Sequence, residues 1–161
     1  MRYCWFILLF LTVTIKVAVA GEPYYGTVKK VMDGDSLLMS VGRKHVEVRL
    51  YGVDAPEYRQ SYGVEAKNYV LQWTSGQRIM IHPEYKDTYG RTVAIISKGQ
   101  RILNEDLVQT GLAWVYPRYC RKEVCESWQD MEKAARSKNL GLWRSSQPIS
   151  PWQWKRSGEG R

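Results

Sequence analysis

Hydrophobic and polar residues alternate along the first third of the chain. In residues 45–51, three aliphatic side chains occupy every second position, and charged or aromatic side chains stand between them. This period of two is typical of a strand with one buried face. Residues 24–41 also favour strands, and Asp33-Gly34-Asp35-Ser36 divides that stretch with residues common in turns. The pattern predicts a three-stranded antiparallel meander.

Further along, the pattern changes to a helical period. Apolar residues recur at helical spacing in residues 64–74, with Gly76 just beyond them, and the same spacing returns in residues 104–110 and 123–138. Two further strands are expected at residues 78–84 and 92–97. After residue 144 the chain is rich in Ser, Pro, Gly, Gln and Arg, so we predict a flexible tail over residues 145–161. Five strands with interleaved helices fit a mainly β, α+β fold, and a Greek-key barrel of the OB type is one candidate among several.

The first twenty residues differ from the rest. Residues 4–15 are apolar apart from two threonines, and Ala18-Val19-Ala20 has the small-residue spacing of a cleavage site. We predict a secretory signal peptide over residues 1–20, and therefore a secreted or periplasmic protein that is not held in a membrane after cleavage. The alternative is an uncleaved N-terminal anchor. A helical span needs about 20 apolar residues, and Lys16 interrupts this run before that length.

Charge and cysteine content narrow the class of protein. Without the leader, which contains Arg2 and Lys16, the 24 basic residues fall to 22 against 16 acidic ones. A basic surface suits a polyanion, but charge alone does not separate nucleic acid from an anionic membrane or from a role in solubility. Cys120 and Cys125 remain after cleavage, and an even pair in an exported protein predicts a disulfide. A zinc site would need more soft ligands nearby.

Acidic residues at two predicted strand ends could hold a metal ion. Asp35 follows Asp33-Gly34 at a turn, and Asp54 comes 19 residues later. If the two strand ends are neighbours, these carboxylates could converge on one hard cation such as Ca²⁺ or Mg²⁺. The simpler interpretation is an Asx turn at Asp33, which is the commoner use of such a sequence.

Three charged residues and a tyrosine supply the remaining parts of a phosphodiester hydrolase. Arg49, on the polar face of its strand, and Arg91 each offer a planar fork for phosphate oxygens. Glu57 follows a proline at the end of the strand and could act as a general base. Tyr89 could stack on a base or donate to a phosphate. Ordinary surface salt bridges and a solvated glutamate remain the alternatives.

These segments, in this order, resemble the staphylococcal nuclease family. The resemblance covers residues 25–143 and rests on four stretches: Val31-Met32-Asp33-Gly34-Asp35, residues 49–57, Tyr89-Gly90-Arg91 and residues 104–113. It implies a five-stranded OB barrel with three helices over residues 21–144, a single Ca²⁺, and endonucleolytic cleavage of DNA and RNA that leaves 3′-phosphate ends.

The resemblance also assigns roles to individual positions. Arg49, Glu57 and Arg91 match the catalytic arginine, glutamate and second arginine, while Asp35 and Asp54 match the calcium-ligating aspartates. Ala55 replaces a threonine that coordinates through its main-chain oxygen. Tyr89 matches a tyrosine at the nucleotide phosphate, and a second nucleotide-contacting tyrosine corresponds to Tyr116. Thr88 replaces a lysine, so the contacts made by that lysine are not carried over.

Two other functions fit parts of the sequence. A non-catalytic OB module would bind nucleic acid without cutting it, and would be favoured by loss of one of the matched catalytic residues, none of which is lost. A basic exported protein that binds an anionic surface would explain charge and export alone. Nothing in the sequence indicates a protein partner, so we expect a monomer whose partners are DNA and RNA.

Overall fold

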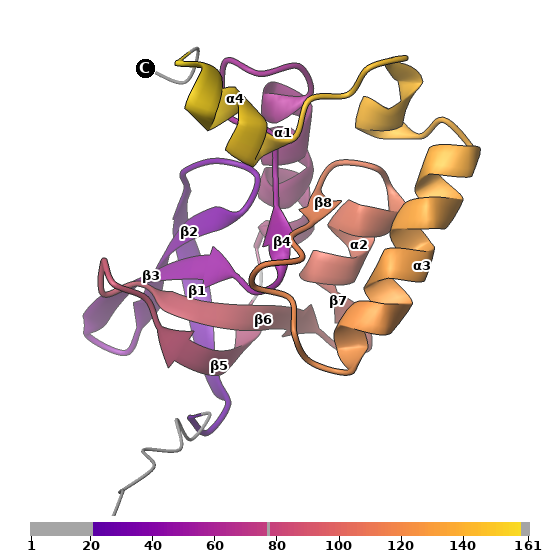
Figure 1. Cartoon of the computed structure of the whole chain (residues 1–161). Coiled ribbons are helices and arrows are strands. Elements are labelled where there is room, and N and C mark those ends of the chain that lie inside the picture. Colours follow the sequence, from indigo (N-terminus) through magenta and orange to yellow (C-terminus); the bar gives the residue numbers. More distant parts are fainter. Residues whose placement is uncertain (1–20, 77, 159–161) are drawn as a thin grey trace, which may run out of the picture.

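The structure of the protein is a computed structural model that describes residues 21–76 and 78–158 (Figure 1). The predicted signal peptide lies outside these residues. Within them, the strands are β1 (Tyr24–Val31), β2 (Ser36–Val41), β3 (Lys44–Leu50), β4 (Val53–Asp54), β5 (Arg78–Lys86), β6 (Thr92–Lys98), β7 (Arg101–Ile102) and β8 (Trp114–Val115). The helices are α1 (Gly63–Thr74), α2 (Leu103–Gln109), α3 (Val124–Ser137), the 3₁₀ helix η1 (Gly141–Arg144) and α4 (Pro151–Ser157).

Five strands close into a barrel. β1, β2 and β3 form the predicted antiparallel meander, β1 also pairs with β5, and β5 pairs with β6. The parallel pairing of β3 with β6, in which Arg49 faces Val93, joins the two edges of this sheet. The short strands β4 and β8 form a second, two-stranded sheet. The predicted five-stranded OB-type barrel is therefore confirmed.

The core follows the predicted alternation. Val48 and Leu50 of β3 are buried in the core, whereas the side chain of Arg49 between them is partly buried and contacts Asp35 and Asp54. Helices α1, α2 and α3 occupy the positions predicted from their periodicity, and Trp128 of α3 is fully buried against the barrel. Figure 1 shows α2 and α3 side by side along one flank of the barrel.

The segment after residue 144 differs from the prediction, which placed no ordered element there. Helix α4 begins with a capping box, in which Ser150 and Gln153 satisfy each other's backbone groups, and Pro151 occupies the first turn. Trp152 packs edge-on against Trp114, and Gln60 donates a 2.6 Å hydrogen bond to the Ile149 carbonyl. The structure thus has four α-helices in its described part, where the sequence predicted three.

Cys120 and Cys125 are joined by a disulfide, as predicted, which links the segment after β8 to the first turn of α3. Within the short loop that the bond closes, the Arg121 N–H donates to the phenolic oxygen of Tyr51 at 3.0 Å, which anchors the loop on the barrel. Among residues 21–76 and 78–158, no helix is long and apolar enough to cross a bilayer.

Candidate active site

Asp35 and Arg49 are brought together by the pairing of β2 with β3. Ser36 stands opposite Arg49 in the register, so the residue before the strand lies beside the guanidinium. Asp35 Oδ2 is 3.1 Å from Arg49 Nη2 and also accepts the Ala55 N–H at 2.7 Å. Asp35 is buried, and its position is fixed by these contacts and by the hydroxyl of Ser36. The predicted convergence of the Asp35 and Asp54 segments is present.

Asp54 approaches the same guanidinium from β4. Its Oδ1 lies 2.7 Å from Arg49 Nη2, while Arg49 Nη1 donates to the Leu50 and Val53 carbonyls at 3.1 and 2.9 Å. Asp54 is 1% exposed, and its second oxygen, Oδ2, is buried without a hydrogen-bond partner. A buried carboxylate oxygen without a partner is costly, because it has lost its water and gained nothing in return. Such an oxygen is suited to a cation.

The close approach of these acids also affects their pKa values. Burial, reinforced by the neighbouring Asp35 carboxylate, raises the pKa of Asp54 to about 7. The same two causes raise the pKa of Asp33 to about 6. Burial alone would lower the pKa of Arg49, but Asp35 and Asp54 outweigh it and raise the pKa, so the guanidinium stays charged. The pocket therefore has more negative charge than Arg49 alone neutralises.

Glu57 lies on the loop between β4 and α1. Its backbone N–H donates to Gln60 Oε1 at 3.1 Å, and a β-carbon on Gly63 would lie 1.9 Å from the Glu57 carbonyl oxygen. Gly63 thus allows helix α1 to begin in contact with this loop. The Glu57 carboxylate is about one-third exposed, and its Oε1 lies 2.8 Å from Lys155 Nζ of α4.

Arg91 and Tyr89 lie on the turn between β5 and β6. Asp87 organises this turn, because its Oδ1 accepts the backbone N–H groups of Tyr89 and Arg91 at 3.0 and 2.9 Å, and its Oδ2 binds Arg91 Nε at 2.7 Å. The guanidinium carbon of Arg91 is 5.4 Å from the centre of the Tyr89 ring, which is 84% exposed. The side chain of Arg91 is 30% exposed, so part of its fork faces solvent.

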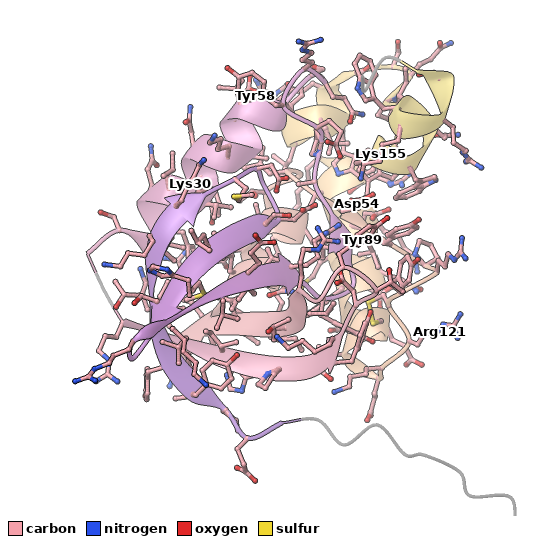
Figure 2. All side chains as sticks on the ribbon, turned by 90° about the vertical axis from the view of Figure 1, so that its left-hand side faces the viewer. Lys30, Asp54, Tyr58, Tyr89, Arg121 and Lys155 are labelled. Carbon is pink, nitrogen blue, oxygen red and sulfur yellow. A yellow bond between two sulfur atoms is a disulfide. The ribbon has the colours of Figure 1, made fainter. Side chains whose placement is uncertain are left out.

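One cavity of about 680 Å³ joins these groups. Among the predicted site residues it is lined by Asp35, Arg49, Asp54, Glu57, Tyr89, Arg91 and Tyr116. Ala55 is buried and is not part of the lining. Its backbone N–H donates to Asp35. Figure 2 shows Lys155, Asp54 and Tyr89 on the same side of the molecule.

Tyr116 takes part in a stack that reaches α4. Its ring is parallel to that of Trp152, with an interplanar angle of 4° and 4.8 Å between the centroids, and it meets Tyr119 edge-on at 4.9 Å. Since one face of the Tyr116 ring is covered by Trp152, a nucleotide could use only what remains of its surface.

Lys155 and Tyr119 line the cavity but were missed by reasoning from the sequence. The signal for Lys155 was present: Ser150-Pro151 followed by Gln153 is the start of a capped helix, and it places Lys155 one turn further on. Tyr119 had no comparable signal, because it lies in an irregular loop.

The acid pair also shows what kind of metal site the protein could form. Among the described residues, no group of three or more His, Cys, Asp or Glu side chains is arranged to hold a metal ion. Asp35 and Asp54 therefore could supply only part of a shell, with main-chain, water or substrate oxygens completing it. An all-oxygen, incomplete shell suits Ca²⁺ or Mg²⁺ and leaves room for a phosphate. The unpartnered Oδ2 of Asp54 fits this arrangement.

The arginines and the carboxylate that line this cavity are suited to one class of reaction. A phosphate in this cavity would meet two guanidinium groups, which can stabilise charge on phosphoryl oxygens, and the partly exposed carboxylate of Glu57, which can accept a proton from water. Those are the components of phosphodiester hydrolysis.

Comparison with known proteins agrees with this chemistry. The family model described as Staphylococcal nuclease homologue matches residues 47–145. The chain is similar to a micrococcal nuclease of Shigella flexneri, with 34% identity over 149 residues, covering 87% of this chain and 85% of that protein. It is 32% identical over 149 residues to an uncharacterized endonuclease of Haemophilus influenzae, covering 92% of this chain and 82% of that protein. The chain is 35% identical over 117 residues to the staphylococcal-like nuclease CAN1 of Arabidopsis thaliana, covering 73% of this chain and 35% of that protein. The chain belongs to the staphylococcal nuclease family.

Proposed function

We propose that the protein is an exported, calcium-dependent endonuclease that hydrolyses phosphodiester bonds in DNA and RNA and leaves 3′-phosphate ends. The observation that carries this proposal is the convergence of Asp35, Asp54, Arg49, Glu57 and Arg91 on one cavity. Membership of a nuclease family gives the reaction class, and the retained residues favour catalysis over binding alone.

Asp35 and Asp54, with the main-chain oxygen of Ala55, are the residues that would hold Ca²⁺. When bound, the ion supplies positive charge that polarises the phosphoryl group. Support comes from Asp54, whose Oδ2 is buried without a partner and whose pKa is raised by burial and then by the neighbouring Asp35 carboxylate.

In this proposal, side chains of the protein transfer the proton and bind the phosphoryl group. Glu57 accepts a proton from the attacking water, whose oxygen forms a new bond to phosphorus. Arg49 and Arg91 bind the phosphoryl oxygens, where negative charge increases in the transition state. The bond from phosphorus to the 5′ oxygen breaks, and that oxygen takes up a proton from solvent, so the phosphate stays on the 3′ end.

Substrate binding is assigned to Tyr89 and Tyr116 together with the basic surface. Tyr89 projects from the β5–β6 turn and is the most exposed tyrosine on the cavity rim. Tyr116 offers a ring edge beside the Trp152 stack. The excess of basic residues attracts the polyanionic substrate from a distance.

Export is supported by the leader-like first twenty residues and by the Cys120–Cys125 disulfide, which is stable in oxidising compartments. In this proposal the enzyme acts as a monomer outside the cytoplasm or in a periplasm.

The proposal is tested by digesting single- and double-stranded DNA and RNA with Ca²⁺, and again with excess chelator, followed by analysis of the product ends. Cleavage that requires Ca²⁺ and yields 3′-phosphates is expected. Calcium binding is measured separately by calorimetry on the wild type and on Asp54→Asn, which keeps the shape of the side chain and removes its charge. The variant should lose most of the calcium affinity while remaining folded by circular dichroism.

Two outcomes would overturn the proposal in different ways. Full cleavage in excess chelator would show that the activity does not depend on calcium. Tight binding of nucleic acid without cleavage, with or without Ca²⁺, would favour the alternative of a non-catalytic OB module.

A further inference from the structure

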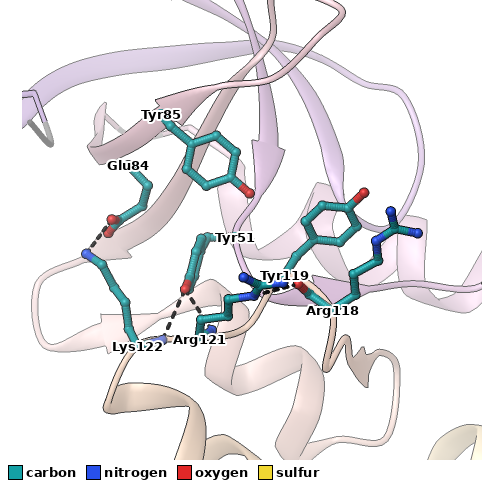
Figure 3. Close-up of a pocket in the computed structure, with 7 residues that line it drawn as sticks. All are labelled: Tyr51, Glu84, Tyr85, Arg118, Tyr119, Arg121 and Lys122. Carbon is teal, nitrogen blue, oxygen red and sulfur yellow. Dashed lines mark hydrogen bonds and ion pairs between the residues drawn. The ribbon is translucent and has the colours of Figure 1, made fainter. Parts of the chain in front are cut away.

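A second hollow of about 640 Å³ adjoins the candidate active site (Figure 3). Its lining consists of tyrosines, basic residues and one acid: Tyr51, Glu84, Tyr85, Arg118, Tyr119, Arg121 and Lys122. Tyr85 and Tyr119 line both this hollow and the active-site cavity. The two spaces are therefore neighbours that share a wall, and a chain leaving one could enter the other.

The hollow is built by two irregular segments. The register of β5 against β6 shifts between Pro83 and Tyr85, and this bulge places Glu84 and Tyr85 at the rim. On the other side, the disulfide between Cys120 and Cys125 constrains the loop that carries the basic residues.

Tyr51 contacts both the β5 bulge and the disulfide-closed loop. It directly follows β3, is buried, and accepts the backbone N–H groups of Arg121 and Lys122 at 3.0 and 3.3 Å. Its ring meets the Tyr85 ring edge-on at 6.4 Å. Tyr51 therefore holds the loop in place through two backbone N–H groups.

The charge of the hollow is positive. Lys122 pairs with Glu84, which leaves the guanidinium groups of Arg118 and Arg121 without a carboxylate partner among the described contacts. Arg121 Nε donates to the Arg118 carbonyl, and Arg118 lies 5.7 Å from the centre of the Tyr119 ring. Figure 3 shows the Lys122–Glu84 pair at one side of the hollow and Arg118 with Tyr119 at the other.

Aromatic surface is also available. Tyr85 is 37% exposed and Tyr119 is 46% exposed, so part of each ring is open to solvent beside its edge-on contact with Tyr51 or Tyr116. Ring faces next to unpaired guanidinium groups are the features with which proteins bind single-stranded nucleic acid, because bases stack on the rings and phosphates pair with the cations.

We propose that this hollow binds the part of a single-stranded DNA or RNA chain that continues beyond the scissile phosphodiester. The inference rests on the proposed function, since it assigns the additional nucleotides of the same substrate. A single strand is favoured over a duplex because only unpaired bases can stack on Tyr85 and Tyr119.

The test is a binding measurement that does not depend on cleavage. Fluorescence anisotropy in excess chelator compares single-stranded oligonucleotides of about 4 and about 16 nucleotides, the range of sites on OB folds. The variant Arg118→Ser/Arg121→Ser should bind the long oligonucleotide more weakly and keep its affinity for the short one. Its slope of log affinity against log salt should fall by roughly 1.4, since each phosphate contact contributes about 0.7 on a single strand.

The variant Tyr119→Leu tests stacking. Loss of one stacked base should weaken binding of the long single strand by about 5- to 150-fold. Binding of a duplex of the same length should change much less. An equal loss for single strand and duplex would show that the surface recognises backbone charge only, and would overturn the proposal.

A matched control separates this site from general electrostatics. Lys29→Ser/Lys30→Ser removes the same charge from exposed positions of β1, and Figure 2 shows Lys30 on the opposite side of the molecule from Arg121. The control should bind both oligonucleotides like the wild type. Equal effects of the arginine pair and the lysine pair, or no effect of either, would refute the site.

These outcomes are independent of the proposed catalysis. If calcium-dependent cleavage is observed but the arginine pair leaves long-oligonucleotide binding unchanged, the hollow is not a binding site and the endonuclease proposal stands. If no cleavage occurs but the length-dependent binding is lost in the variant, the hollow is supported and the endonuclease proposal fails.

Discussion

The ammonium of Lys155 lies 2.8 Å from Oε1 of Glu57 and 3.7 Å from Oδ1 of Asp54, so the C-terminal helix places a cation among the acids of the candidate active site. Burial would lower the pKa of Lys155, but Asp54 and Glu57 attract the charged form more strongly and raise it. The lysine therefore remains charged at neutral pH and neutralises part of the same negative field that would bind a metal ion.

Replacing Lys155 with Met should therefore tighten calcium binding. The side chain is about half exposed and solvent screens its charge, so the expected gain is modest, about 2- to 5-fold, which corresponds to the range of partly exposed ion pairs. Isothermal titration calorimetry of Ca²⁺ measures it. Arg156→Met, an equal loss of charge at the next position, serves as the control because Arg156 is exposed and its side chain donates to the Trp152 carbonyl. Weaker calcium binding by Lys155→Met would contradict the argument.

Most of the fold was predictable because its signals are local. The alternation in β3 and the helical spacing in α1, α2 and α3 follow directly from which residues face one core. The meeting of Asp35 with Arg49 could also be anticipated, since a tight hairpin between β2 and β3 leaves few possible registers.

Helix α4 could not be predicted by the same reasoning. It is short, largely polar and buries little, so hydrophobic periodicity gives no signal, and only its capping box marks it. The position of Lys155 beside Glu57 depends on tertiary contacts, such as the stack of Trp152 on Tyr116 and the hydrogen bond from Gln60 to Ile149. The unpartnered Asp54 Oδ2 is likewise a property of packing.

Gly63→Ala should harm both stability and catalysis. A β-carbon there would lie 1.9 Å from the Glu57 carbonyl oxygen, so the loop that carries Glu57 must move. Forcing an atom into such a site typically costs about 1–3 kcal/mol in the free energy of unfolding. Urea denaturation and kcat are the measurements.

Gly99→Ala is the control for this prediction. Gly99 has a positive φ of 60°, unlike Gly63, and nothing lies within 4 Å of the added carbon. It should lower stability by about 1 kcal/mol through backbone strain and leave kcat unchanged. Equal kcat in the two variants would show that the contact at Gly63 does not position Glu57.

The disulfide should contribute modestly to stability. Cys120 and Cys125 close a loop with a sequence separation of 5, for which the chain-entropy model gives about 2 kcal/mol. Cys120→Ser/Cys125→Ser should therefore lower the midpoint of urea denaturation without unfolding the protein. Adding a reductant should produce a similar shift in the wild type and none in the variant. If neither the double substitution nor the addition of reductant to the wild type changes the midpoint, the prediction is wrong.

The division of work between the arginines and Glu57 is tested by three conservative substitutions. Arg49→Lys should lower kcat by on the order of 10² to 10³, as does loss of a preorganised donor elsewhere, because an ammonium cannot replace the planar contact that now spans Asp35 and Asp54. Arg91→Lys should have a similar effect, since its Nε is held by Asp87 and the rest of the fork is left for phosphate.

Glu57→Gln should lower kcat by about 10² to 10⁴ if the carboxylate is the general base. It should leave the affinity for a nucleotide largely unchanged, because the phosphate would be bound by the arginines and the metal site. Steady-state kinetics with Ca²⁺ gives kcat, and anisotropy in chelator gives affinity. Asp130→Asn, on the exposed face of α3 and not among the residues that line the cavity, is the control and should match the wild type. If all three site variants keep a kcat near that of the wild type, the reaction takes place elsewhere, and the roles assigned by family resemblance are wrong.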